Sequence, residues 1–131
     1  MFFVIGLGNP ERRYTGTRHN IGFEVVDRLA QALRMQFKPG RGEFLIAQGN
    51  FRDQPLILVK PLTFMNESGV AVMEIRDQFD ARNEDLFVVC DDFQLPLGQL
   101  RIRLRGSDGG HNGLYSIIYH LQSEEFPRLR C

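Results

Sequence analysis

The hydrophobic pattern of this chain alternates between short apolar runs and amphipathic stretches. Residues 2–7 and 86–90 are continuous apolar runs closed by polar or turn-forming residues, which is typical of strands buried on both faces of a sheet. Apolar residues recur at helical spacing over about residues 21–35 and 67–80, and again after the glycine-rich stretch 109–113. The pattern therefore predicts two buried strands and three amphipathic helices.

A pair of strands is expected between the first two helices. Residues 43–48 and 55–60 are rich in apolar and β-forming side chains, and a polar stretch containing Gly49, Asn50 and Asp53 joins them. Two such runs separated by turn-forming residues predict a β-hairpin.

The C-terminal third of the chain predicts two more strands. Residues 99–104 alternate strictly, so one face carries apolar side chains and the other carries arginine (Leu100, Ile102 and Leu104 against Arg101, Arg103 and Arg105). Residues 127–131 resemble the opening of a strand at which the chain stops, so we expect a domain of marginal stability. Together these elements predict a single α/β domain, residues 1–131, with a twisted mixed central sheet flanked by helices.

Composition and charge narrow the class of protein. The 131 residues suit one domain, and 43% apolar residues indicate a globular chain. The 16 basic and 16 acidic residues cancel, which argues against nucleic-acid binding through bulk positive charge but allows a local patch. Residues 1–66 carry nine basic and five acidic side chains, a balance of 9 − 5 = +4, whereas residues 67–131 carry seven and eleven, 7 − 11 = −4.

The cysteines and the apolar runs predict a cellular compartment. Cys90 lies inside an apolar run and Cys131 has no partner pattern, so neither belongs to a disulfide framework, and a reduced cytoplasmic protein is expected. The N-terminus lacks the features of a secretory signal, and no apolar stretch approaches the ~20 residues of a membrane span. We therefore expect neither a secreted nor an integral membrane protein.

Candidate chemistry gathers where apolar elements end, which is where open α/β sheets usually bind their ligands. The polar clusters are residues 6–10, 17–20, 63–66 and 109–113, together with Asp91. Their combination indicates a site more strongly than any one of them.

The first cluster, Gly6-Leu7-Gly8-Asn9-Pro10, allows three interpretations. A dinucleotide-binding fingerprint would need glycine at position 11, where Glu11 would instead repel a pyrophosphate. The cluster could simply be a strand-terminating turn in which Asn9 forms an Asx-turn. Alternatively, the Asn9 amide donates a hydrogen bond to a ligand oxygen.

A histidine and a carboxylate form the candidate catalytic pair. His19 precedes a predicted helix and lies outside its apolar stripe, and Asp91 follows a predicted strand. A carboxylate bonded to one imidazole nitrogen leaves the other free to take a proton from water. Asp91 and Asp92 could instead form a solvated loop or hold magnesium, although successive residues of an extended segment point in opposite directions. We assign the inward position to Asp91, a choice that spacing does not force.

Three asparagines could supply neutral hydrogen-bonding groups. Asn9, Asn66 and Asn112 lie at turns or element starts, where the last two could equally be helix N-caps. As a set they would bind amide and ester carbonyl groups without a formal charge. No serine or cysteine has the context of a nucleophile elbow, so an activated water is favoured over a covalent acyl-enzyme.

The remaining histidines do not predict a metal centre. His111 and His120 lack ligand partners at helical or C-x-x-C spacing, so a zinc site is not expected. We interpret His111 as satisfying backbone groups at a helix start and His120 as a surface residue.

Three motifs resemble those of bacterial-type peptidyl-tRNA hydrolase. They are Gly6-Leu7-Gly8-Asn9-Pro10 through Tyr14 with Thr17-Arg18-His19-Asn20, then residues 60–69 (KPLTFMNESG), then residues 109–114 (GGHNGL). The resemblance runs in the same order from about Phe2 to Arg130. It implies a monomeric, cofactor-free α/β hydrolase that cleaves the ester between a peptide and the 3′ ribose of tRNA.

The resemblance also implies a role for each matching residue. His19 would be the general base, Asp91 its orienting carboxylate, and Asn9 the donor to the substrate carbonyl or developing oxyanion. Asn66 and Asn112 would hold the peptide backbone and the water, while Met65 and Tyr14 shape the pocket. For tRNA phosphates, the candidates are Arg101 and Arg103 with Arg105 and Arg128 or Arg130 nearby, although arginines on an exposed sheet face are often only solubilising.

The chain departs from the family pattern at two points. Glu11 replaces the glycine that usually follows Asn9-Pro10, and the family continues past Arg130 with a lid segment and a C-terminal helix. An RNA-binding relative that has lost catalysis is the alternative function. The enzyme is favoured by the joint retention of five residues, namely His19, Asp91, Asn9, Asn66 and Asn112. A phosphate-binding domain, resting on the first turn alone, is the weakest alternative.

Overall fold

A computed structural model describes residues 1–11 and 16–131, so the predicted pocket residue Tyr14 lies outside the described residues. Over these residues the chain forms a mixed seven-stranded sheet in the order β2-β3-β4-β1-β5-β7-β6. The strands are β1 (Phe2–Gly6), β2 (Lys38–Pro39), β3 (Phe44–Phe51), β4 (Gln54–Pro61), β5 (Leu86–Cys90), β6 (Arg101–Arg103) and β7 (Arg128–Arg130).

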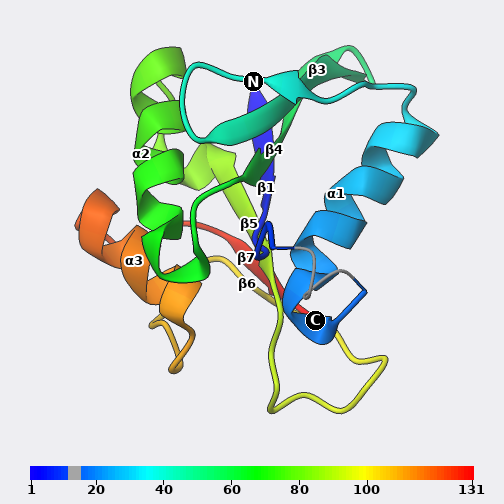
Figure 1. Ribbon diagram of the computed structural model, residues 1–131. Helices are drawn as coiled ribbons and strands as arrows, with labels where there is room; N and C mark the ends of the chain where they lie inside the picture. The colour runs from blue at the N-terminus through cyan, green and yellow to red at the C-terminus, as the bar shows by residue number, and fades with distance from the viewer. Residues whose placement is uncertain (12–15) are drawn as a thin grey trace.

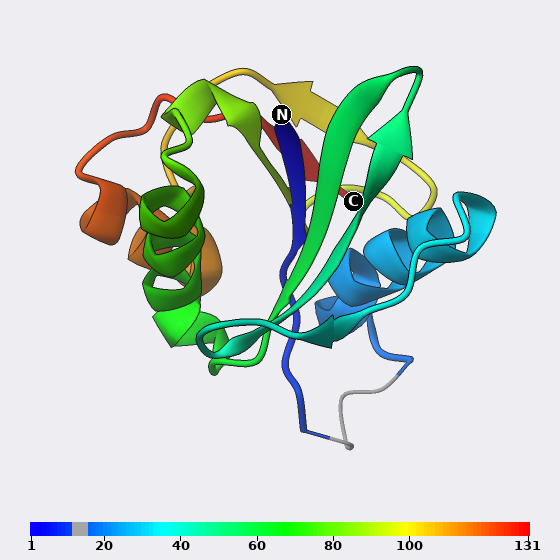
Figure 2. The same ribbon diagram turned by 90° about the horizontal axis from the view of Figure 1, so that it is seen from above.

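Helices cover both faces of this twisted sheet. They are α1 (Ile21–Ala32), α2 (Ser68–Phe79) and α3 (Asn112–Leu121), with short 3₁₀ turns η2 (Arg18–Asn20), η3 (Met65–Glu67) and η4 (Asn83–Asp85). Figures 1 and 2 show α1 on one face and α2 with α3 on the other. The predicted single α/β domain with a mixed central sheet flanked by helices is confirmed.

The hydrophobic core is divided between the two faces by the sheet. The larger part lies under α2 and α3 and includes Phe3, Ile5, Ile75 and Ile117. The smaller part lies under α1, where Val26 packs with apolar residues of β1, β4 and β5. A continuous apolar run places residues on both faces, which is why β1 and β5 are buried on both sides.

The predicted hairpin is present, with longer strands and a tighter turn than expected. Its turn is Arg52-Asp53, and both residues have left-handed φ values, +51° and +64°. Two consecutive left-handed residues make the type I′ geometry that matches the twist of paired strands. Gly49 and Asn50, expected in the connection, instead lie within β3 opposite residues of β4.

The strand connections create a crevice at one edge of the sheet. β1 is parallel to both β4 and β5, and β5 is parallel to β7. The chain leaves β1 toward α1 on one face, whereas after β5 it runs through the edge strand β6 before it reaches α3 on the other face (Figure 2). The loops that follow β1 and β5 therefore diverge, and the carboxyl ends of these neighbouring strands form the topological switch point at which such sheets bind ligands.

Glycines bring the start of α1 directly against this crevice. A Cβ atom on Gly22 would strike backbone atoms of Leu7 and Val89, and one on Gly6 would strike the Gly22 backbone. A side chain on Gly8 would meet the Phe23 ring. The glycines of the first cluster therefore serve helix–strand packing, in agreement with a strand-terminating turn.

The strand expected over residues 99–104 is only three residues long. β6 is the outermost strand and pairs with β7 alone, so its ends lack a second neighbour. The expected alternation is present, but both faces of this edge are open: Leu100, Ile102 and Leu104 are 67%, 59% and 79% exposed. The C-terminal strand predicted at residues 127–131 is also present, as β7 between β5 and β6.

Candidate active site

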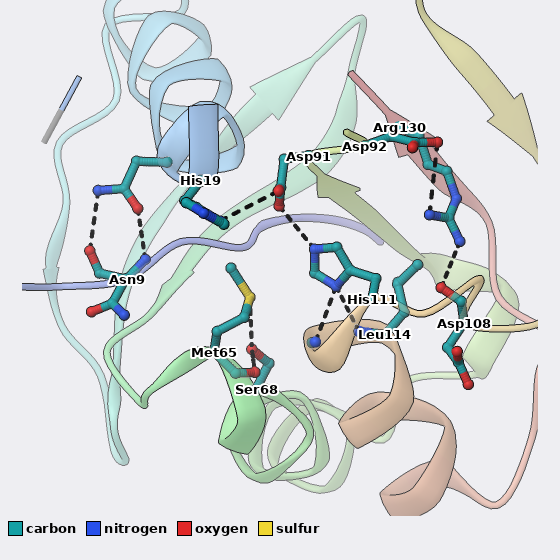
Figure 3. Close-up of polar contacts among 12 residues, drawn as sticks. Asn9, His19, Met65, Ser68, Asp91, Asp92, Asp108, His111, Leu114 and Arg130 are labelled. Carbon is teal, nitrogen blue, oxygen red and sulfur yellow. Dashed lines mark hydrogen bonds and ion pairs between the residues drawn. The ribbon is translucent and has the colours of Figure 1, made fainter. Parts of the chain in front are cut away.

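Three side chains from distant segments meet at the carboxyl end of β5. His19 comes from η2, Asp91 from the end of β5, and His111 from the start of α3 (Figure 3). His19 Nδ1 lies 3.5 Å from Asp91 Oδ2, and His111 Nε2 lies 2.9 Å from Asp91 Oδ1. Asp91 is 2% exposed, whereas the His19 side chain is 46% exposed. A buried carboxylate thus lies between two imidazoles, one of them open to solvent.

Asp92 has different partners from its neighbour. Its Oδ1 accepts the backbone N–H of Gln94 at 2.9 Å, and its Oδ2 lies 3.8 Å from Nη1 of Arg130. Consecutive residues leave a strand on opposite sides, so only one of the two can face η2. The structure brings Asp91, as expected, toward His19.

The orientation of the His19 ring suits proton transfer with solvent. Its Nδ1 faces Asp91, so Nε2 lies on the opposite side of the ring. The edge of the Phe93 ring packs against the imidazole, with centroids 4.7 Å apart and planes at 72°. The ring is therefore held between a carboxylate and an aromatic side chain and is not sealed in the core.

A cavity of about 320 Å³ adjoins this pair and gathers several predicted residues. Its walls include His19, Asp91, Met65, Asn112 and Arg130. Asp92, Phe93 and Gln94 also line the cavity, as do Gly109, Gly110 and His111 of the predicted polar cluster 109–113.

Asn66 and Asn112 are exposed beside the cavity and are not N-caps. Asn66 lies inside η3, directly after Met65, and does not itself line the cavity. Asn112 is the first residue of α3, whose N-cap is His111. The N-cap interpretation was therefore wrong for both, because Glu67 is the N-cap of α2 and His111 is the N-cap of α3.

A pair of hydrogen bonds between two asparagines holds the loop after β1. The Asn9 N–H donates to Asn20 Oδ1 at 2.7 Å, and Asn20 Nδ2 donates to the Asn9 carbonyl oxygen at 3.1 Å. Asn20 is buried at the N-cap position of α1, yet its side chain makes no cap hydrogen bond. The residue after His19 thus ties the Asn9 loop to the turn that carries His19. Sequence reasoning missed it because an asparagine before a helix resembles an ordinary cap.

The side chain of Asn9 forms one of the expected interactions. Its Oδ1 accepts the Glu11 N–H at 3.2 Å, which confirms the Asx-turn. The amide nitrogen Nδ2 makes no hydrogen bond to the residues drawn in Figure 3, so donation to a ligand stays a prediction. Asn9 does not itself line the cavity beside Asp91.

The nearby hydroxyl and thiol groups are poor nucleophiles. Burial raises the pKa of the Cys90 thiol to about 12, and the charge of the adjacent Asp91 acts in the same direction. The Ser68 hydroxyl is buried and donates to the Met65 carbonyl oxygen at 2.7 Å. Among the described residues, no group of three or more His, Cys, Asp or Glu side chains could hold a metal ion. The burial of this thiol and this hydroxyl disfavours either group as a nucleophile.

The arginines near β7 divide into buried and exposed members. Arg128 is 1% exposed and donates to the carbonyl oxygens of Ser107, Glu124 and Phe126. Burial, with a smaller contribution from Arg130, lowers its pKa. Its hydrogen bonds fix the loops on either side of α3. The guanidinium is thus occupied by carbonyl oxygens, which argues against the expected phosphate contact at Arg128.

A second cavity of about 240 Å³ adjoins the first and is lined by all five arginines, Arg128 included. Arg101 is directly opposite Arg130 in the β6–β7 ladder, and Arg103 is opposite Arg128, so the four side chains leave one face of the sheet. Arg101 and Arg103 are exposed, whereas Arg130 is largely buried and donates to the Asp108 carbonyl oxygen at 2.8 Å. Arg105 Nη1 lies 3.7 Å from Oε1 of Glu125, and both side chains are exposed.

Fold and site together define an α/β protein with a histidine–carboxylate pair and an arginine-lined surface at the switch point of its sheet. The family model described as peptidyl-tRNA hydrolase matches residues 3–131. The chain belongs to this family.

Individual relatives agree along nearly the whole chain. A peptidyl-tRNA hydrolase of Chlorobaculum parvum is 52% identical over 130 residues, and one of Thermoanaerobacter sp. is 50% identical; each match covers 99% of this chain. The crystal structure of peptidyl-tRNA hydrolase from Acinetobacter baumannii superposes with a TM-score of 0.95 at 33% identity. The chain spans 68% and 71% of the two relatives and 66% of the crystallised chain. Among the described residues, none of the helices is long and apolar enough to span a bilayer.

Proposed function

We propose that this chain hydrolyses the ester bond between a peptide and the 3′ ribose of tRNA in peptidyl-tRNA. The observation that carries the proposal is the solvent-open His19 imidazole facing the buried Asp91 carboxylate beside a cavity. Membership of the family supports the same activity. We further propose that the chain acts as a monomer in the cytoplasm, as the family resemblance implies.

In the proposed mechanism, His19 is the general base. Asp91 accepts a hydrogen bond from the Nδ1–H group, which leaves Nε2 unprotonated. Nε2 then takes a proton from a water molecule while the water oxygen attacks the ester carbonyl carbon. The resulting imidazolium returns that proton to the ribose 3′ oxygen as the ester C–O bond breaks. The products are the carboxylic acid of the peptide, which releases its proton to solvent, and tRNA with its 3′ hydroxyl; no covalent enzyme intermediate forms.

Neutral amides complete the proposed mechanism. Nδ2 of Asn9 donates to the carbonyl oxygen, on which negative charge develops in the transition state. Asn112 and Asn66 bind main-chain amides of the peptide, and Met65 contributes an apolar wall. Such a site contacts what all peptides share, so it accepts many side chains at the cost of little selectivity among them.

The direct test measures release of the acyl group from N-acetyl-aminoacyl-tRNA by this chain. We expect hydrolysis that yields intact tRNA and no trapped acyl-enzyme, because the chemistry passes through water. Binding of the tRNA without hydrolysis would overturn the proposal and favour the non-catalytic RNA-binding alternative.

We propose that Arg101 and Arg103, with Arg130 behind them, contact tRNA phosphates. Replacing either exposed arginine with alanine should raise KM for the tRNA substrate and lower the slope of log KM against log salt by about one per lost phosphate contact. Arg28→Ala is the matched control, since Arg28 is an exposed arginine on α1, on the other face of the sheet. Equal effects of the three variants would show that these arginines only solubilise the edge of the sheet.

A further inference from the structure

The hydrogen bonds of His111 determine which of its ring nitrogens carries the proton. Nδ1 lies 3.0 Å from the backbone nitrogen of Gly113 and 3.2 Å from that of Leu114, and both of these N–H groups donate to it. A nitrogen that accepts hydrogen bonds cannot itself carry a proton, so the proton of the neutral ring is on Nε2. That nitrogen lies 2.9 Å from Asp91 Oδ1, an acceptor. One neutral tautomer, with its proton on Nε2, therefore satisfies all three of these hydrogen bonds.

The backbone around α3 favours this arrangement of the ring. His111 is the N-cap of the helix, with extended φ and ψ of −85° and 120°, and its side chain replaces the usual serine, aspartate or asparagine cap. A Cβ atom at position 113 would lie 2.9 Å from His111 Cε1 and 2.8 Å from Met65 Sδ, so Gly113 leaves the space in which the ring packs. The His111 side chain is 11% exposed. The ring thus has little freedom to turn over.

We propose that His111 is a positioning residue for the hydrolysis, and that the N-terminus of α3 acts through it on the catalytic pair. The inference rests on the proposed function. The cap holds the tautomer, the Nε2–H group holds Asp91 Oδ1, and Asp91 therefore presents Oδ2 to His19. The contact of Asp91 with His111 is 0.6 Å shorter than its contact with His19 (3.5 − 2.9 Å), so His111 is the partner that fixes the carboxylate.

The same hydrogen bond adjusts the charge that His19 experiences. A donor on Oδ1 withdraws negative charge from the carboxylate, and less negative charge on Oδ2 stabilises the protonated imidazole of His19 less. The hydrogen bond from His111 therefore moderates the attraction between Asp91 and the imidazolium of His19. The titratable and charged groups facing Asp91 are these two imidazoles, the thiols of Cys90 and Cys131, and the Asp92–Arg130 pair beside it.

Two substitutions separate the two hydrogen-bonding functions of the ring. His111→Asn keeps an acceptor near Nδ1 and so keeps the helix cap, but it cannot reach Asp91. His111→Gln places an amide N–H about where Nε2 lies, so it can donate to Asp91 while losing the cap. His120→Asn is the control, because His120 lies on the same helix and its Nδ1 hydrogen-bonds the Ser116 carbonyl oxygen at 2.9 Å instead of Asp91.

A positioning role predicts opposite effects of the two variants on stability and on pH dependence. For His111→Asn we expect an unchanged denaturation midpoint, a kcat lowered about tenfold with a similar KM, and an acid limb of the kcat/KM profile at higher pH. For His111→Gln we expect a lower denaturation midpoint but an acid limb where the wild-type protein has it. If the asparagine variant keeps the wild-type profile and kcat, the ring is only a helix cap and the inference is wrong.

The tautomer can be tested without measuring activity. In ¹⁵N NMR of the wild-type chain, we expect His111 to show a protonated Nε2 and an unprotonated, hydrogen-bonded Nδ1 at neutral pH. The opposite tautomer would overturn the inference whatever the enzyme does. A wild-type chain that hydrolyses no peptidyl-tRNA would instead overturn the proposed function and the positioning role with it, while the NMR result would still decide whether the cap fixes the tautomer.

Discussion

Replacing His19 with alanine is expected to lower the rate of N-acetyl-aminoacyl-tRNA hydrolysis by at least ~10²-fold, the effect of removing a positioned general base. The ring is half exposed and lies between Asp91 and Phe93 at the surface, so its removal should leave the fold intact. The measurement is kcat from initial rates under saturating substrate, together with a thermal denaturation curve for each protein.

The split between kcat and KM identifies the role of His19. Loss of a base lowers kcat and leaves substrate binding nearly unchanged. Equal hydrolysis by the wild-type and His19→Ala proteins would show that another group activates water. A raised KM with normal kcat would assign His19 to substrate binding.

Asp91→Asn is expected to cost roughly 10²-fold or more in kcat, because it leaves His19 in the wrong tautomer. The Nε2–H group of His111 needs an acceptor, so the amide oxygen of the new asparagine should face His111. Its NH₂ group then faces His19 and donates to Nδ1, which places the histidine proton on Nε2. A protonated Nε2 cannot accept the proton of a water molecule.

Asp92→Asn is the matched control for this substitution. It makes the same chemical change one residue later, where the carboxylate contacts Arg130 and the Gln94 backbone. We expect its kcat to stay within about threefold of wild type, since the new amide oxygen still accepts the Gln94 N–H and the contact with Arg130 is long, at 3.8 Å. A larger effect at Asp92 than at Asp91 would reverse the assignment of the orienting carboxylate.

Neighbouring residues in the loops of the site have different partners. His19 and Asn20 are consecutive, yet one faces Asp91 and the other binds the Asn9 backbone. His111 caps α3 and also binds Asp91. The turn that carries His19 therefore presents one residue to Asp91 and uses the next residue to hold a neighbouring loop. A substitution at a holding residue moves a reacting group without touching the substrate.

Several parts of the site could be predicted from the sequence. His19 and Asp91 follow from residue types at the ends of predicted elements, and the structure places them side by side. Met65 and Asn112 were expected to form the pocket and do line the cavity, as does Arg130, which was expected to contact phosphate. Their catalytic and binding roles remain predictions for the experiments above. The asparagine pair and the contact of His111 with Asp91 could not be predicted, because each depends on which way a side chain turns.

The arginines and leucines of the edge strand show a second limit of sequence reasoning. Alternation over residues 99–104 predicts two faces but does not say what covers them. In the folded chain β6 is outermost and both faces are open, while Arg128, which looked like another surface arginine, is buried among carbonyl oxygens. Burial depends on neighbouring elements that the local pattern does not specify.

The sequence by itself determined the elements, their order and the residue types available at the carboxyl edge of the sheet, because periodicity and turn chemistry act over a few residues. The tertiary structure decided which of two adjacent aspartates faces His19, which nitrogen of His111 carries its proton, and which asparagine holds another. Those choices depend on hydrogen bonds and an ion pair between distant groups: the two asparagines are 11 positions apart, His111 and Asp91 are 20 apart, and His19 and Asp91 are 91 − 19 = 72 apart. Such bonds exist only after the sheet has brought its strand ends together.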